Sequence, residues 1–221
     1  MAQGGFITFE GVEGGGKSTQ IFLLSRAFEA TGADVLVTRE PGGTSLAEQV
    51  RNLVLADTEG GVDPKSELFL YLAARHDHVA KRIQPALDAG AWVLCDRFAD
   101  ATVAYQGHGR NMDVEAVSQL AWWGHGGRPD LTILLDLPVD DGLARVASRG
   151  EQNRLDREAI DFHQRVRDGY HQIAKAEPDR VAIIDASNDV ATVHRTIISA
   201  VRERLGSRLP AGLLPWSEAG P

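Results

Sequence analysis

The chain lacks several features that mark other classes of protein. Cys95 is its single cysteine, which excludes an internal disulfide framework and is typical of a reducing compartment. No run of 18 apolar residues occurs, and the first residues, MAQGGF, lack the charged and apolar segments of a signal peptide. We therefore expect a cytoplasmic protein that neither spans a membrane nor is secreted.

The chain of 221 residues also lacks an excess of positive charge. Its 23 Lys and Arg are outnumbered by 31 Asp and Glu, which gives a net charge of −8, and they form no dense basic run. A protein that holds a nucleic-acid polymer usually carries a basic surface, so we do not expect such a partner. Small phosphates remain suitable ligands, because a loop and a few arginines are enough to bind them.

Short apolar runs alternate with longer helical patterns along the chain. The runs predict strands at Phe6–Glu10, Val35–Thr38, Trp92–Asp96, Leu131–Asp136 and Val181–Asp185. The periodic segments predict helices near residues 18–31, 45–56, 65–84, 113–124, 139–148, 158–176 and 190–205. Strands joined by helical crossovers indicate an α/β fold, with a parallel sheet covered by helices on both faces. We expect one domain over residues 1–205 and a loosely held tail over 206–221.

Residues 11–18 read GVEGGGKS and match the phosphate-binding loop pattern G-x-x-x-x-G-K-S. A predicted strand precedes this loop and a predicted helix follows it, as the motif requires. Glycines let backbone N–H groups turn toward a phosphate, and the helix N-terminus adds further N–H groups. Lys17 would reach the β- and γ-phosphates, and the Ser18 hydroxyl would bind Mg²⁺. The residues expected to hold the nucleotide are Gly11, Val12, Glu13, Gly14, Gly15, Gly16, Lys17 and Ser18.

The loop predicts nucleotide binding but not a reaction, and three further stretches are more specific. They are TREPGGT at 38–44, ELFLYLAARHDH at 67–78 and CDRFADATVAYQGHGR at 95–110. Together with the loop they resemble the thymidylate kinases, from about residue 6 to residue 205. The resemblance implies a P-loop nucleoside monophosphate kinase fold, with a five-stranded parallel sheet, helices on both faces and a mobile lid. It also implies a homodimer that phosphorylates dTMP to dTDP with ATP and Mg²⁺.

The same resemblance assigns roles to residues near the nucleotide. Arg97, in the sequence DRF, matches the arginine that holds the monophosphate, and a guanidinium suits this role because it can bind phosphate through two hydrogen bonds. Asp96 would help to organise Mg²⁺ and its waters. Glu13 matches an acid that approaches the sugar 3′-hydroxyl. The alternatives are an exposed loop charge for Glu13 and a capping acid for Asp96.

Base recognition is expected from the second stretch, where the family stacks an aromatic ring on thymine and places an arginine four residues later. Tyr71 and Arg75 hold these positions, and a helix would bring them side by side. The family residue is usually Phe, so the Tyr71 hydroxyl needs a partner or water, and packing in the core is the alternative. Thr102 matches a small polar residue that faces the base. Tyr105, followed by Gln106, would crowd the sugar 2′ position and favour deoxyribose.

A lid is expected at residues 147–159, ASRGEQNRLDREA. Val12 to Gly15 of the phosphate loop contain no arginine, although phosphoryl transfer needs positive charge on the transferring group beyond Lys17 and Mg²⁺. Some members of the family supply this arginine from the lid. We expect Arg154 first and Arg149 second in this catalytic role, and an exposed ion pair for Arg157.

Other functions stay open at this point. Another P-loop kinase could act on a different monophosphate, whereas a nucleoside kinase would need a carboxylate base that the sequence does not offer clearly. No general base is expected for dTMP, because its phosphate oxygen is already ionised. A GTP-dependent switch usually carries N-K-x-D, which is missing. A non-catalytic nucleotide-binding module would be expected to lose Lys17, Arg97 or the lid arginines, and all are present.

Overall fold

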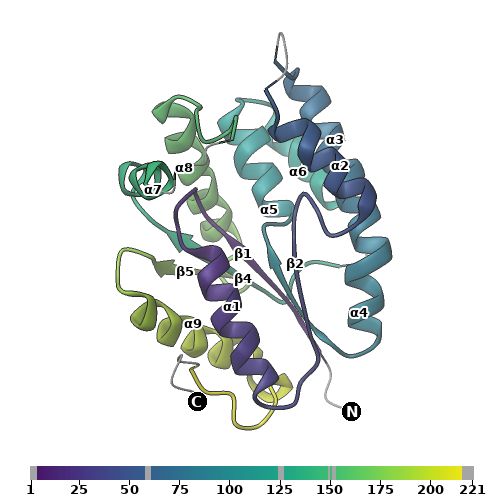
Figure 1. The fold of residues 1–221 in the computed structure, drawn as a ribbon, viewed down its shortest axis with the longest axis vertical. Helices are drawn as coiled ribbons and strands as arrows, with labels where there is room; N and C mark the ends of the chain where they lie inside the picture. The colour runs from purple at the N-terminus through teal and green to yellow at the C-terminus, as the bar shows by residue number, and fades with distance from the viewer. Residues whose placement is uncertain (1–3, 58–60, 124–126, 149, 151–152, 216–221) are drawn as a thin grey trace.

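Five parallel strands form a sheet in the order β2-β3-β1-β4-β5 (Figure 1). The strands are β1 (Phe6–Glu10), β2 (Val35–Arg39), β3 (Trp92–Asp96), β4 (Leu131–Asp136) and β5 (Val181–Asp185). The predicted strands are confirmed. Only the second differs in its bounds: it extends one residue further, to Arg39. The computed structural model describes residues 4–57, 61–123, 127–148, 150 and 153–215.

Helices connect the strands. They are α1 (Lys17–Glu29), α2 (Ser45–Leu55), α3 (Pro64–His78), η1 (Val79–Ile83), α4 (Gln84–Asp88), α5 (Ala99–Thr102), η2 (Val103–Gly109), α6 (Val114–Trp122), α7 (Val139–Ala147), α8 (Ile160–Ala176), α9 (Val190–Leu205) and η3 (Gly206–Arg208). Side chains that precede several helices accept backbone N–H groups at the helix start, as do Thr44 before α2 and Asp63 before α3. These caps explain why the predicted helices begin close to the observed positions.

The helical segment over residues 99–109 is absent from the sequence prediction. Its sequence contains Gly107 and Gly109, which weaken an isolated helix. Tertiary packing supplies the missing stability, because η2 packs against α6 and α8. A Cβ on Gly109 would lie 2.7 Å from the Phe162 ring, so glycine permits this close approach. The segment places Thr102, Tyr105 and Gln106 beside the carboxyl ends of the strands.

The two faces of the sheet have different chemistry. Ile7 and Phe9 of β1 join the main hydrophobic core together with residues of α1 and α9. These two helices lie in front of the sheet in Figure 1. The alternate residues Thr8 and Glu10 point to the opposite face. Thr8 is hydrogen-bonded at 2.8 Å to Thr132, which faces helix α5, and Glu10 accepts the hydroxyl of Tyr170 from α8. Polar groups thus gather between the sheet and the helices of this face.

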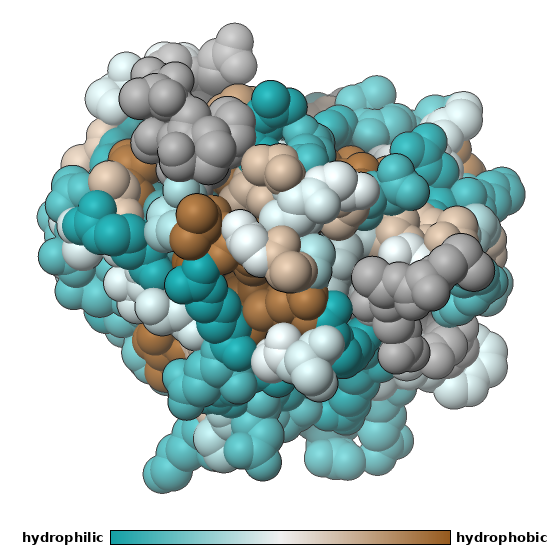
Figure 2. Space-filling view, turned by 90° about the horizontal axis from the view of Figure 1, so that it is seen from below, coloured by the Kyte–Doolittle hydropathy of each residue, from teal (hydrophilic) through white to brown (hydrophobic). Residues whose placement is uncertain are grey.

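The lower end of the molecule, where the strands begin, is mainly hydrophilic, with hydrophobic residues gathered near its middle (Figure 2). Part of the segment expected to be a loose tail packs here. Leu213 is buried in the main core, and the Arg208 guanidinium pairs with Asp130 at 2.5 Å. In the described part of the chain, no helix combines the length and apolar character needed to cross a membrane.

Candidate functional site

A cavity of about 280 Å³ lies at the carboxyl ends of the strands. Parallel α/β sheets bind ligands at this edge, where the loops that follow the strands converge. The cavity is lined by segments that are far apart in the sequence: the phosphate loop, the loop after β2, helix α3, the segment after β3 and the lid. Of the predicted site residues, its lining includes Glu13, Gly14, Lys17, Tyr71, Arg75, Asp96, Arg97, Thr102, Tyr105 and Gln106.

The phosphate loop connects β1 to α1, as its sequence predicts. Gly11, Gly14 and Gly16 have φ angles of 129°, 73° and 85°, a region that disfavours residues with a Cβ. A Cβ on Gly14 would also overlap the carbonyl oxygen of Gly142. Helix α1 begins at Lys17, so its unpaired N–H groups and positive dipole end face the loop. The backbone is therefore already shaped to receive an anion.

Lys17 is buried and turned back onto the loop. Its Nζ donates to the carbonyl oxygens of Gly11 at 3.1 Å and Val12 at 2.9 Å. Burial, together with the nearby charge of Arg97, lowers the pKa of Lys17 to about 8. A bound phosphate would supply the negative charge that favours the protonated ammonium group.

Arg97 stands at the centre of the polar groups in the cavity. Its guanidinium donates to Gly11 O at 3.0 Å, to the Tyr170 hydroxyl at 3.2 Å and to Glu13 Oε1 at 3.2 Å. It also lies 4.8 Å from the centre of the Tyr105 ring. Its φ of 68° is unusual for a residue with a side chain. The surrounding contacts therefore hold Arg97 in a strained conformation that directs its charge at the phosphate loop.

Glu13 brings a second charge into the loop, with opposite sign. One carboxylate oxygen, Oε1, accepts hydrogen bonds from Tyr105 and Arg97. The other, Oε2, lies 3.3 Å from Nδ1 of His163. Burial acts to raise the pKa of Glu13, but His163, Arg97 and the Lys17 ammonium outweigh it and lower that pKa to about 2. Glu13 therefore stays ionised near neutral pH, and its interactions differ from those of an exposed loop charge.

Arg75 is almost fully buried, with a side chain 2% exposed, beside Tyr71 on helix α3. Its Nε donates to Glu40 at 2.6 Å, and Nη2 donates to Phe98 O and to Thr102 Oγ1, both at 2.9 Å. Nη1 is a buried donor without a partner among the described residues. Arg75 is also part of the cavity lining, and a buried donor without a partner is uncommon in native proteins.

Tyr71 also lines the cavity and is half-buried. Burial raises its pKa to about 12, so the hydroxyl is neutral, and it makes no hydrogen bond with the part of the chain that the structure describes. The Gln106 side chain already has a partner within the protein, because its Nε2 donates to Glu67 Oε1 at 2.9 Å.

Ser18 and Asp96 lie close enough to share a cation. The Ser18 hydroxyl donates to Asp96 Oδ2 at 3.4 Å, and Asp96 Oδ1 is buried without a partner among the described residues. Hydroxyl and carboxylate oxygens are the ligands that Mg²⁺ prefers. Over the same residues, no group of three or more His, Cys, Asp or Glu side chains converges to hold a metal. Any ion here would need further oxygens from water or phosphate.

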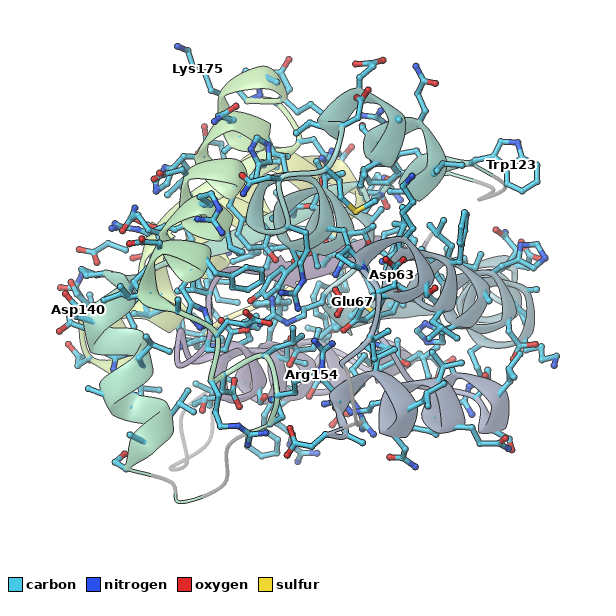
Figure 3. The ribbon with its side chains drawn as sticks, turned by 90° about the horizontal axis from the view of Figure 1, so that it is seen from above. Asp63, Glu67, Trp123, Asp140, Arg154 and Lys175 are labelled. Carbon is cyan, nitrogen blue, oxygen red and sulfur yellow. The ribbon has the colours of Figure 1, made fainter. Side chains whose placement is uncertain are left out.

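The lid arginines differ in their surroundings. Arg154 lies beside Glu67 of α3 (Figure 3) and donates to its carboxylate. Its Nη2 also donates to Val54 O at 2.9 Å. In this conformation it is not part of the cavity lining. Arg157 forms an exposed ion pair with Asp57 at 2.5 Å, which confirms the expectation for that residue. Arg149 lies outside the described residues.

Sequence reasoning missed several residues at the site. Glu40 belongs to the quoted TREPGGT stretch and anchors both Arg75 and His78, at 2.6 and 3.0 Å. Arg39 and Arg51 add positive charge to the cavity lining. From the lid, the same lining includes Asn153, Leu155 and Asp156. A short run of sequence does not reveal which of its charges turn inward, so only their proximity to the motifs could have indicated them.

Comparison with known proteins matches the thymidylate kinase family model over residues 9–197, most of the chain. The chain belongs to the thymidylate kinase family. The thymidylate kinase of Desulfovibrio desulfuricans is 49% identical over 215 residues, which cover 92% of this chain and 99% of the relative. That of Magnetococcus marinus is 50% identical over 204 residues, 91% and 97% of the two chains.

A solved structure supports the same relationship. The crystal structure of thymidylate kinase from Ehrlichia chaffeensis matches with a TM-score of 0.75 and 37% identity, covering 90% of this chain and 98% of that one. The fold predicted from the resemblance is therefore confirmed: a five-stranded parallel sheet with helices, of the P-loop nucleoside monophosphate kinase type. Members of the thymidylate kinase family use ATP as the phosphate donor.

Proposed function

We propose that this chain is a dTMP kinase: it transfers the γ-phosphate of ATP to dTMP and forms dTDP, a step in dTTP synthesis. Membership of the thymidylate kinase family supports this activity. The structural observation that carries the proposal is one cavity lined by Lys17 of the phosphate loop, by Arg97, and by Arg75 and Tyr71 of α3. A nucleoside monophosphate can place its phosphate near Arg97 and its base near α3 in this space.

Thymine fits the groups near α3. The unpartnered Arg75 Nη1 is a donor, and the thymine ring offers carbonyl oxygens as acceptors. The Tyr71 ring offers a flat apolar face for stacking. Thr102 supports Arg75 through its hydroxyl. Tyr105 and Gln106 complete the substrate side, where the Tyr105 ring would disfavour a 2′-hydroxyl.

The transfer needs positioning and charge rather than a proton acceptor. An oxygen of the dTMP phosphate attacks the γ-phosphorus of ATP and forms a new P–O bond, while the bond to the β,γ-bridging oxygen breaks and ADP leaves with its electrons. Residues Gly11 to Ser18 hold the ATP phosphates, and Lys17 neutralises their charge. Arg97 holds the dTMP phosphate in line. Glu13 accepts the sugar 3′-hydroxyl.

Mg²⁺ fits the Ser18 and Asp96 oxygens described above, and when bound it supplies charge neutralisation at the ATP phosphates. Arg154 supplies further positive charge to the transferring group, with Arg149 as the second candidate. For this, the Arg154 side chain must leave Glu67 when the lid closes over ATP. Exclusion of water at that stage strengthens each charge interaction.

A homodimer is proposed as the functional assembly, in the cytoplasm, with no polymer or membrane partner. Helices α3 and α6 carry large exposed apolar side chains: Phe69 is 59% exposed and Leu120 37% exposed. Trp123, just after α6, is 79% exposed and projects from the body (Figure 3). Exposed apolar side chains mark an interaction surface when they form a continuous patch, so we propose that these residues share the dimer interface.

The test is an ADP-release assay with MgATP and a panel of acceptors: dTMP, dUMP, UMP, CMP, AMP, GMP and thymidine. Strong turnover with dTMP, weaker turnover with dUMP and little with the others is expected. Among these acceptors dUMP should come nearest to dTMP, because the two differ by one methyl group, which is worth only about 1–3 kcal/mol of discrimination.

Two other results would reject the proposal in different ways. Preferred turnover of another monophosphate would keep the phosphate chemistry and reject the base assignments to Tyr71 and Arg75. Absence of turnover from folded protein that still binds ATP would favour a nucleotide-binding module.

A further inference from the structure

His163 of helix α8 is an unusual residue in this core. Its side chain is only 1% exposed, and both ring nitrogens are buried without a hydrogen-bond partner among the described residues. The Phe162 ring packs edge-on against the imidazole, with ring centres 5.4 Å apart. Buried polar atoms in native proteins nearly always have hydrogen-bond partners, so a buried imidazole whose nitrogens make no well-aligned hydrogen bond calls for a functional explanation.

The group that faces this imidazole is the phosphate-loop carboxylate. Nδ1 of His163 lies 3.3 Å from Glu13 Oε2, which is itself buried and unpartnered. The other oxygen, Oε1, accepts from Tyr105 and Arg97, both of which line the cavity. His163 is not part of that lining. It therefore lies behind Glu13 as seen from the substrate, and a small rotation would complete an Nδ1–H···Oε2 hydrogen bond.

We propose, building on the dTMP kinase function above, that His163 is a positioning residue that acts on the substrate sugar through Glu13. Its Nδ1–H holds Oε2 at the back of the loop, and this fixes Oε1 among Arg97 and Tyr105, where the 3′-hydroxyl of dTMP is received. A carboxylate held by one oxygen only could rotate about its terminal bond, whereas one held at both oxygens presents a single orientation to the sugar.

The charges around the imidazole agree with this role. Glu13 stays ionised, because its pKa is lowered to about 2. Asp156 of the lid also interacts electrostatically with Glu13 and His163, and burial raises its pKa. The carboxylates of the phosphate loop and the lid therefore both interact electrostatically with this imidazole, and a neutral apolar side chain there would remove the nitrogen that lies beside Oε2.

The experiment compares three variants on two acceptors. His163→Leu removes both nitrogens, His163→Asn keeps a donor near the Nδ1 position, and His163→Gln places its amide near the Nε2 position. The acceptors are dTMP and its 3′-deoxy analogue, which lacks the hydroxyl that Glu13 receives. Initial rates give kcat/KM for each acceptor, with KM for ATP as the internal control. Far-ultraviolet circular dichroism and thermal melting establish folding, and His163→Gln replaces the Leu variant if the latter does not fold.

We expect His163→Leu to lower kcat/KM for dTMP about tenfold, with KM for ATP within about twofold, because a lost hydrogen bond to a charged group has about this effect. Rates with the 3′-deoxy analogue should change little, so the dTMP preference collapses, and His163→Asn should restore most of it. In a Glu13→Gln background, His163→Leu should cause no further loss of preference.

An equal loss on both acceptors would mean that His163 serves the fold only, and would overturn the inference. An unchanged preference would do the same. A wild-type chain without dTMP kinase activity would instead reject the proposed function. A wild-type enzyme that uses dTMP but does not distinguish the two acceptors would leave that function intact and reject the assignment of Glu13, and His163 with it, to the sugar.

Discussion

Tyr71 has two interpretations at the base site: its ring stacks on the base, or it only packs within the protein. Its ring lines the cavity beside Arg75, while its hydroxyl makes no hydrogen bond among the described residues. Because stacking uses the ring and not the hydroxyl, Tyr71→Phe should leave kcat/KM for dTMP within about twofold. Tyr71→Ala should lower it at least about fivefold, since a base–aromatic stack is worth about 1–3 kcal/mol. Steady-state kinetics with dTMP measures both, and an unaffected Ala variant would show that Tyr71 only packs.

Lys17 gives a prediction on proton uptake. With its pKa lowered to about 8 by burial, roughly half of the free enzyme carries a neutral Lys17 at pH 8. Bound phosphate favours the charged form, so ATP binding should take up a proton fraction of about one half at pH 8 and clearly less at pH 7. Isothermal titration calorimetry in two buffers with different ionisation enthalpies measures this uptake.

Glu10 provides the control for that measurement. Burial raises its pKa to about 8 as well, so it could also bind a proton when negative charge arrives nearby. Glu10→Gln removes this site but keeps a side chain of similar shape. Uptake that persists in the variant belongs to Lys17, whereas uptake that disappears would contradict the assignment.

At the scale of elements, the contact between the lid and α3 holds Arg154 away from the place where its proposed catalytic role needs it. Arg154 is held by Glu67 and Val54 O in this structure, so its catalytic role requires the lid to move. We expect Arg154→Ala to lower kcat by at least ~10² while ATP affinity stays nearly intact, because its charge would act only on the transferring group. Arg157→Ala is the matched control, since that arginine forms an exposed ion pair and should stay within about twofold. Equal kcat values for the two variants would reject the role.

The elements also show what a sequence can and cannot predict. Nearly continuous apolar runs predicted the strands almost to the residue, because a strand covered on both faces favours apolar side chains at most of its positions. The loop at 11–18 was predictable for a similar reason: its glycines meet a local backbone requirement. The helical segment at 99–109 was not, because its stability comes from contacts with α6 and α8 rather than from its own composition.

At the scale of the whole molecule, the part of the site that could not be predicted is which side chains form pairs with one another. Motif residues such as Lys17, Arg75 and Arg97 were identified from the sequence. Their partners were not: Glu40 lies 35 residues from Arg75, and Glu67 lies 87 residues from Arg154. Such pairs form only when the sheet order brings distant loops to one edge, so a linear pattern contains no signal for them.

Assembly is the remaining property of the whole molecule that the surface allows us to test. Phe69 on α3 is 59% exposed. Phe22 is similarly exposed at 57% but belongs to α1, a helix that packs against α9. If copies associate through α3 and α6, a buried charge in that interface costs far more than the same charge in water. Phe69→Asp should therefore shift the dimer toward monomer in sedimentation equilibrium, whereas Phe22→Asp should leave the mass unchanged. Dissociation by Phe22→Asp alone would place the interface on α1 instead, and a wild-type monomer would remove the dimer altogether.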